Sequence, residues 1–178
     1  LAFSHKYKND GYVSMTYLGD GAVNQGQVYE SFNMAALWKL PVVFVIENNK
    51  YGMGTSVTRA SAGRSLAERG KAYGIPGIEV DGMNVFSVRE AGKEALDYSR
   101  NGKGPFILEM KTYRYRGHSM SDPAKYRARS EVDAVRQQKD CIENLKEILQ
   151  ENKVTDDELK GFDTEIKSTV TKAEEFAL

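Results

Sequence analysis

Two short polar segments contain the residue types that bind a divalent cation and a phosphate group. Gly19-Asp20-Gly21 places a carboxylate between two glycines, and Asn48-Asn49 supplies amide oxygens. Mg²⁺ takes oxygen ligands and usually combines one or two protein ligands with waters and the phosphates of a substrate. A carboxylate alone would repel a phosphate, so the pattern favours a site in which a cation lies between them. Asp20 and Asn49 are the candidate metal ligands.

Each polar segment follows a predicted strand. Residues 12–18 are rich in β-branched and aromatic side chains, and residues 42–47 (VVFVIE) form a continuous apolar run typical of a strand buried on both faces. A helix is predicted over residues 27–40 and is ended by Pro41. Because ligands bind outside the carboxyl ends of parallel strands, both polar segments are expected to face one crevice. The helix start after the first segment is expected to offer free N–H groups to a phosphate.

The alternation of elements continues along the chain. A helix is predicted over residues 65–73, a strand over 78–80, a helix over 85–100 and a strand over 106–112, followed by an Arg-rich loop over 113–129. This order predicts an α/β fold with a doubly wound, mainly parallel sheet. One helical pattern runs from Ser130 to about Glu151, and a capping box from Thr155 to Glu158 begins another helix. We predict an α/β domain over residues 1–129 and a C-terminal helical extension over residues 130–178.

Composition excludes several classes of protein. Lys plus Arg and Asp plus Glu both number 25 in 178 residues, which gives no electrostatic basis for binding nucleic acid or an anionic membrane. The longest apolar run, around Pro41, is far shorter than the roughly 20 residues of a membrane-spanning helix. Cys141 has no second cysteine to pair with, which favours a reducing compartment. The chain begins at Leu1 within what resembles a helix end, so an upstream part of the domain is expected to be missing.

Two other classes of protein compete with a cation-binding enzyme. A dinucleotide-binding oxidoreductase requires GxGxxG spacing, which residues 19–26 (GDGAVNQG) lack, and an acidic residue for the ribose after the second strand. A noncatalytic module that only assembles with other subunits stays open on the residues alone. Calorimetry with a cofactor that carries phosphate groups distinguishes such an assembly module from a cofactor-binding chain.

The arrangement of the two polar segments resembles the thiamine-diphosphate motif, with 26 residues between Gly21 and Asn48. The match extends to GDGAVNQGQVYESFNMAALWKLPVVFVIENNKYGMGTSVTRASA and to TYRYRGHSMSDP. These segments resemble the alpha subunits of pyruvate dehydrogenases, in the thiamine-diphosphate-dependent 2-oxo acid dehydrogenase family. The resemblance is strong over about residues 1–129 and looser over the helical tail.

This resemblance implies roles for particular residues. The implied Mg²⁺ ligands are Asp20, the side-chain oxygen of Asn49 and the backbone carbonyl of Tyr51. The implied cofactor-binding set adds Gly19, Gly21, Ala22, Arg114 and His118. Of these, His118 is the implied catalytic residue, which orients the cofactor or the acyl intermediate, and Arg114 and Arg116 pair with the diphosphate or with neighbouring carboxylates.

The resemblance also implies an activity and partners. The activity is oxidative decarboxylation of pyruvate, with the acetyl group passed to lipoamide on a partner acyltransferase. A beta subunit supplies the activating glutamate in an alpha2-beta2 heterotetramer, in the bacterial cytoplasm or alternatively the mitochondrial matrix. Branched-chain 2-oxo acid and acetoin dehydrogenases share the GDG and ENN segments and remain alternatives.

Two serines bear on regulation. Ser56 and Ser119 match positions that kinases phosphorylate in animal members. The segment SDPAKYR is shorter than the animal form, and Arg116 replaces a histidine common there, so a bacterial enzyme without this regulation is favoured.

Overall fold

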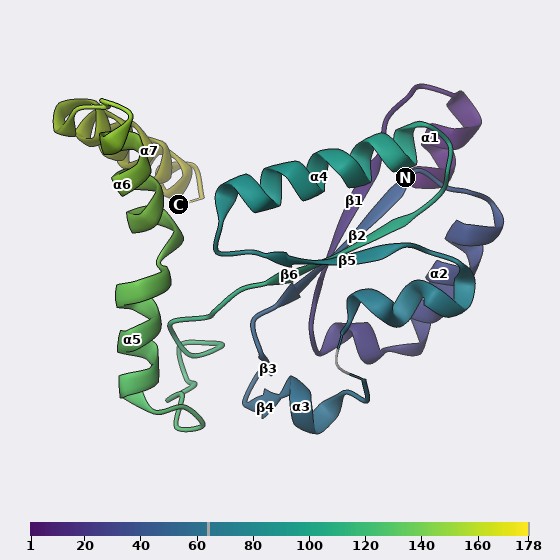
Figure 1. Cartoon of the computed structure of the whole chain (residues 1–178), viewed down its shortest axis with the longest axis horizontal. Coiled ribbons are helices and arrows are strands. Elements are labelled where there is room, and N and C mark those ends of the chain that lie inside the picture. Colours follow the sequence, from purple (N-terminus) through teal and green to yellow (C-terminus); the bar gives the residue numbers. More distant parts are fainter. Residues whose placement is uncertain (64, 178) are drawn as a thin grey trace. The chain divides into compact units, whose positions relative to one another are not determined.

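The centre of the molecule is a four-stranded sheet in which every neighbouring pair is parallel (Figure 1). The computed structural model describes residues 1–63 and 65–177; Arg64 and Leu178, which fall in the predicted domain and extension, lie outside the described residues. The strands lie in the order β1-β2-β6-β5, and they are β1 (Ser14–Gly19), β2 (Val42–Asn48), β5 (Gly77–Asp81) and β6 (Phe106–Lys111). The predicted α/β fold with a mainly parallel sheet is confirmed.

Helices cover both faces of this sheet (Figure 1). Alternate side chains of β2 divide between two apolar clusters, because successive residues of a strand point to opposite faces. Phe44 and Ile46 pack with α2 (Gly26–Leu37) and the 3₁₀ helix η2 (Ala67–Tyr73) on one face. Val43 and Val45 pack with α4 (Val85–Arg100) on the other. Burial on both faces explains why β2 reads as a continuous apolar run.

The register of β1 and β2 brings the two polar segments together. Gly19 at the end of β1 pairs with Glu47 near the end of β2, so both strands end at the same edge of the sheet. Between Gly19-Asp20-Gly21 and α2 lies a 3₁₀ turn, η1 (Ala22–Asn24), which the sequence did not predict. Val23 within it is fully buried and holds the turn against the core. The N–H groups next to Asp20 therefore belong to η1 rather than to the start of α2.

The second polar segment contains structure of its own. After β2, the chain forms an antiparallel hairpin of β3 (Tyr51–Gly52) and β4 (Thr55–Ser56), followed by the short helix α3 (Val57–Ala60). At the N-terminus, α1 (Ala2–Lys8) precedes β1.

Three predicted helices differ from those in the structure. The helix predicted over residues 65–73 is the 3₁₀ helix η2, which begins at Ala67. Helix α2 ends at Leu37 rather than near Leu40, because Lys39 adopts a left-handed backbone with φ of 45° before Pro41 is reached. The single helix predicted from Ser130 to Glu151 is wrong. It is two helices, α5 (Arg129–Lys139) and α6 (Cys141–Glu151), and the side chain of Asp140 caps the second by accepting from the N–H groups of Ile142 and Glu143.

The capping box before α7 (Asp156–Ala177) is confirmed. The Glu158 N–H donates to Oγ1 of Thr155 at 3.3 Å, and the Thr155 N–H donates to Oε2 of Glu158 at 2.8 Å. The chain forms two compact units, Leu1–Gln138 and Lys139–Leu178. None of the helices within the described residues has the length and apolar character needed to cross a membrane.

Candidate functional site

Asp20 is a buried carboxylate at the end of β1. Its residue is 3% exposed, although Gly19 and Gly21 on either side of it are exposed. Burial raises the pKa of the Asp20 carboxyl, and a backbone hydrogen bond and the charge of Arg114 partly oppose that rise. A carboxylate withdrawn from water in this way gains most from a cation placed against it.

Asn49 and Tyr51 lie in the loop that follows β2. Oδ1 of Asn49 lies 3.4 Å from the Tyr51 N–H, and the residue between them, Lys50, has a left-handed backbone with φ of 74°. This loop contacts the one after β1, because a Cβ atom added at Gly21 would lie 3.5 Å from the Cα of Gly52. The two predicted metal-binding segments are therefore neighbours in space.

Gly19, Gly21 and Ala22 line the same edge of the sheet. Gly19 is the last residue of β1, Gly21 caps η1 and Ala22 is its first residue. The backbones at Gly21 and Gly52 lie side by side, since a Cβ atom added at either glycine would be in van der Waals contact with the Cα of the other. Backbone N–H groups at the start of a helical turn are suited to binding an anion.

The side chain of Arg114 reaches into this loop. Its Nη1 lies 3.2 Å from the backbone oxygen of Tyr51 and 3.5 Å from Oδ1 of Asn49. Its Nη2 donates to the Met53 oxygen at 2.8 Å and to the hydroxyl of Tyr126 at 3.0 Å. The guanidinium therefore contacts two of the oxygens predicted to bind Mg²⁺, those of Asn49 and Tyr51. It is also close enough to the third predicted ligand, Asp20, to lower the pKa of that carboxyl against the rise that burial causes.

The donor set fits a hard divalent cation. It combines one carboxylate, one amide oxygen and one backbone carbonyl, and Mg²⁺ accepts such a set when phosphates and waters complete six ligands. The guanidinium marks the same place as favourable for positive charge. Within the described part of the chain, no group of three His, Cys, Asp or Glu side chains is arranged to hold a metal. A mixed oxygen set is therefore the arrangement that these residues support.

His118 is exposed and lies next to Arg114. Its Nδ1 is 3.3 Å from Nη1 of Arg114. A guanidinium has only donors, so the Nδ1 of His118 is the acceptor wherever this contact is a hydrogen bond. The backbone N–H of His118 donates to Oδ2 of Asp122 at 2.7 Å, which fixes the direction of the loop at this point.

Asp122 is a site residue that the sequence did not reveal. Its Oδ1 accepts from the Ala124 N–H at 2.8 Å, and its Oδ2 accepts from the His118 N–H and from the Tyr126 hydroxyl at 2.9 Å. These hydrogen bonds, chiefly the one from the His118 N–H, hold the pKa of the Asp122 carboxyl below its usual range. Gly117 allows the loop to fold back, since a Cβ atom there would lie 2.3 Å from the Asp122 backbone oxygen.

Arg127 is the second residue that the sequence did not reveal. It is buried, and its guanidinium carbon lies 5.2 Å, 5.4 Å and 5.8 Å from the ring centres of Tyr113, Tyr126 and Tyr51. It also donates to the backbone oxygens of Arg114 and Arg116. The interleaved Tyr and Arg residues of the loop were the available signal. Arg116 itself is exposed, and its carbonyl accepts from Arg127.

The chain matches the dehydrogenase E1 component family over residues 1–177. It is 58% identical over 177 residues to a pyruvate dehydrogenase E1 component subunit alpha from Zymomonas mobilis, covering 99% of this chain and 50% of that protein. The protein of the same name from Rhizobium meliloti is 57% identical, covering 99% of this chain and 51% of its own length.

A third relative is the mitochondrial pyruvate dehydrogenase E1 component subunit alpha of Dictyostelium discoideum. It is 53% identical, with 100% of this chain and 47% of that protein covered. The chain thus spans about half the length of these relatives. Because the family match covers all the elements that surround Asp20, Asn49 and Arg114, the chain belongs to the dehydrogenase E1 component family.

Proposed function

We propose that this chain supplies the metal and diphosphate end of the thiamine-diphosphate site in the alpha subunit of a pyruvate dehydrogenase. The activity is oxidative decarboxylation of pyruvate, with transfer of the acetyl group to lipoamide on an acyltransferase. Membership of the dehydrogenase E1 component family and relatives named as pyruvate dehydrogenase alpha subunits support this activity. Neither name favours a branched-chain or acetoin dehydrogenase, or an assembly module.

One observation carries the proposal. The guanidinium of Arg114 lies 3.2 Å from the Tyr51 oxygen and 3.5 Å from Oδ1 of Asn49, beside the buried Asp20 carboxylate. The proposed metal ligands thus share one positively charged neighbour, Arg114, and this supports their assignment to a common cation site.

Each residue has a role in binding. Asp20, the Asn49 side chain and the Tyr51 carbonyl hold Mg²⁺, with Asp20 supplying the negative charge. The N–H groups around Gly21 and Ala22 favour phosphate oxygens. Arg114 pairs with the diphosphate, because a guanidinium binds phosphate oxygens with charge-assisted hydrogen bonds.

His118 is the residue of this chain that we assign to catalysis. When bound, thiamine diphosphate supplies the nucleophilic carbon and the electron sink for decarboxylation. His118 is exposed on the loop beside Arg114, so its ring is accessible to an oxygen of the substrate or acyl group. The loop over residues 113–129, which Asp122 and Arg127 hold in shape, orients His118 and limits the access of water.

The remaining assignments concern organisation. Residues 1–129 form the cofactor-binding part and residues 130–178 the helical extension. A beta subunit completes the site in an alpha2-beta2 heterotetramer. We place this enzyme in the bacterial cytoplasm, because two of the similar proteins come from bacteria. That subunit carries the acid that activates the aminopyrimidine. Of the acids in this chain nearest the motifs, Glu30 lies on α2 and Glu47 near the end of β2, and both are exposed.

Calorimetric titration of the assembled enzyme with thiamine diphosphate, with and without Mg²⁺, tests this proposal. Asp20→Ala should abolish the Mg²⁺-dependent part of binding, because a carboxylate ligand to a hard cation has no substitute in this loop. Asn49→Ala should weaken binding less, since the charge of the site is kept. The matched control is Asp97→Ala, which removes an exposed carboxylate on α4 and should bind as the wild type does. Unchanged binding in Asp20→Ala contradicts the proposal.

A further inference from the structure

Glu109 is a fully buried acid in the middle of β6. The side chain is 0% exposed, and its neighbours along the strand are the apolar residues Ile107, Leu108 and Met110. A buried carboxylate is costly unless hydrogen bonds satisfy it. Packing alone does not require an acid at this position, so the groups that its two oxygens hold are the reason for its presence.

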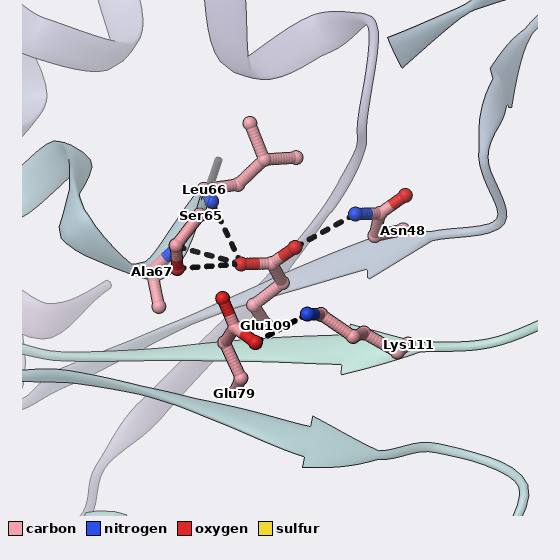
Figure 2. Close-up of polar contacts among 7 residues, drawn as sticks. All are labelled: Asn48, Ser65, Leu66, Ala67, Glu79, Glu109 and Lys111. Carbon is pink, nitrogen blue, oxygen red and sulfur yellow. Dashed lines mark hydrogen bonds and ion pairs between the residues drawn. The ribbon is translucent and has the colours of Figure 1, made fainter. Parts of the chain in front are cut away.

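Four donors converge on this carboxylate (Figure 2). Oε1 accepts from Nδ2 of Asn48 at 2.7 Å. Oε2 accepts from the N–H groups of Leu66 at 2.7 Å and Ala67 at 2.9 Å, and from the Ser65 hydroxyl at 3.1 Å. Each partner presents a hydrogen atom, so an acceptor-only carboxylate matches all of them and an amide does not.

Asn48 transmits this contact to the loop after β2. While its Nδ2 donates to Glu109, its Oδ1 accepts from the Lys50 N–H at 3.1 Å. Lys50 has a left-handed backbone, which is costly for a residue other than glycine and needs such support. Lys50 lies between Asn49 and Tyr51, whose oxygens form the proposed metal site. The orientation of the Asn48 amide thus fixes the loop on which both oxygens lie.

The other oxygen of Glu109 holds the far end of the same segment. Leu66 caps η2 and Ala67 is its first residue, so their N–H groups have no carbonyl partner within the helix. Glu109 therefore joins the start of the segment, at Asn48, to its end, at Ala67. Figure 2 shows the carboxylate between these two ends.

We propose that Glu109 is a positioning residue for the metal site. By holding Asn48, it sets the path of the loop that carries the Asn49 side-chain oxygen and the Tyr51 carbonyl. This inference rests on the proposed function, because it assumes that those oxygens bind the cation. Glu109 lies outside the motif segments, and in this positioning role it contacts neither the metal nor the diphosphate.

Three variants of the assembled enzyme test the idea. Glu109→Gln presents an NH₂ group to one set of donors. In Asn48→Asp, a carboxylate oxygen lies against Oε1 of Glu109, in place of the amide group that donated the 2.7 Å hydrogen bond. The double variant restores the match, because the amide introduced at position 109 can donate to the carboxylate introduced at position 48. That carboxylate still accepts from the Lys50 N–H, and the double variant keeps the net charge of the wild type.

The measured quantity is the dissociation constant of Mn²⁺, read from the electron paramagnetic resonance signal of the free ion at saturating thiamine diphosphate. Loss of a group that hydrogen-bonds a metal ligand weakens metal binding by about 10- to 100-fold. Asn48 is not itself a ligand but holds the loop that carries two of them, so we expect a loss at the lower end of that range, about 10-fold, in each single variant and recovery of most of it in the double variant. The unfolding temperature without metal and cofactor is measured in parallel, since a merely structural role would lower it without changing Mn²⁺ binding by folded protein.

Asn48→Asp separates positioning from simple charge. An added negative charge near a cation site would tighten Mn²⁺ binding if only the field mattered. Positioning predicts weaker binding, because two carboxylates in contact displace the loop. Asn48→Asp that binds Mn²⁺ as well as or better than the wild type overturns the proposal, and so does Glu109→Gln with wild-type binding. If Glu109→Gln does not fold, Asn48→Asp compared with the double variant decides by the same criterion.

The matched control lies on the neighbouring strand. Glu79 pairs with Glu109 in the register of β5 and β6, and it forms an ion pair with Lys111 at the surface (Figure 2). It also interacts with the Ser65 hydroxyl, one of the four donors to Glu109, but it has no contact with Asn48 among the described hydrogen bonds. Glu79→Gln therefore removes the same charge by the same substitution while keeping the bond between Glu109 and Asn48, and it should leave Mn²⁺ binding unchanged. Asp20→Ala distinguishes the two levels of the argument. If Asp20→Ala binds Mn²⁺ normally, the metal site itself is misplaced; if it loses binding while Glu109→Gln does not, only the positioning role is wrong.

Discussion

The site depends on a single buried carboxylate whose charge needs a partner. Asp20 is withdrawn from water, and Arg114 is a positive group that approaches both it and the neutral oxygens of Asn49 and Tyr51. Because two cations cannot share one set of oxygens at close range, metal binding requires the guanidinium to leave this position. The same movement would free it to pair with a phosphate.

The proposed metal ligands came from the sequence, but the groups that support them did not. Asp20 and Asn49 follow strands with clear apolar patterns, and the resemblance added the Tyr51 carbonyl. Asp122 and Arg127 act through backbone groups of their own loop, whose path depends on turns such as the left-handed Ala124. No periodicity encodes such contacts. Glu109 left one signal, a lone acid in an apolar strand, which calls for a buried partner.

At the residue scale we predict that His118→Ala leaves the fold and metal binding intact and lowers turnover. The residue is exposed, and its side chain contacts Arg114 rather than a core residue, so its removal creates no cavity. Loss of a general acid or base commonly costs 10²- to 10⁴-fold, which sets the scale of the expected decrease. The measurement is turnover with lipoamide and with an artificial electron acceptor, alongside the unfolding temperature. Wild-type rates in both assays would show that His118 is incidental.

Parallel pairing of adjacent strands is what brings the two loops together. The sequence predicted the ends of β1, β2, β5 and β6 to within two residues. Burial on both faces leaves long apolar runs in β2 and β6, whereas β1 and β5 are only partly buried and were predicted from their short apolar segments between turns. The break between α5 and α6 was missed because the charged pattern continues through it, whereas the Asp140 cap depends on local backbone geometry. The hairpin of β3 and β4 was missed because two-residue strands carry too little pattern to detect.

The loop over residues 113–129 is the element whose order depends most on one charge. The pKa of Asp122 is lowered from its ordinary value of 3.8, chiefly by the His118 N–H. A lowered carboxyl pKa means that the stabilisation is present above that ordinary value and is lost as the pH falls through the folded pKa. At neutral pH the loop has the full contribution.

Asp122→Asn should loosen this loop at neutral pH. The amide must turn its NH₂ group toward either the Ala124 N–H or the His118 N–H and Tyr126 hydroxyl, so at least one donor loses its acceptor. We expect faster tryptic cleavage after Lys125 and Arg129 in the native protein, followed by mass spectrometry. Asp133→Asn, an exposed change on α5, is the control. Equal cleavage rates in the two variants would show that Asp122 does not order the loop.

At the scale of the whole molecule, the proposed function assigns this chain one side of a divided site. With equal numbers of acidic and basic residues it has no general attraction for anions, so phosphate binding depends on local groups at the sheet edge. The chain also spans about half the length of its relatives. The acids nearest the motifs, Glu30 and Glu47, are exposed, and we assign neither of them to a proton relay. Completion by other polypeptide segments is therefore part of the proposal.

The divided site predicts that the 178-residue chain alone does not turn over pyruvate. We assign its residues to a metal and a diphosphate, whereas activation of the cofactor needs an acid that we place on the beta subunit. Reduction of an electron-accepting dye measures the activity directly. Addition of a beta subunit and the remainder of the alpha subunit should restore it. Robust turnover by the purified chain without any partner would place the catalytic acid within these residues.

The most direct measurement is a crystal structure of the assembled enzyme with thiamine diphosphate and Mn²⁺, in which anomalous scattering locates the metal. We predict a peak at about 2.1 Å, the distance for an octahedral cation of this kind, from Asp20, Oδ1 of Asn49 and the Tyr51 carbonyl oxygen. We also predict that the Arg114 guanidinium has left those oxygens and contacts the diphosphate. A metal peak elsewhere, or Arg114 still on Asn49 and Tyr51 beside a bound cofactor, would contradict the assignment of this site.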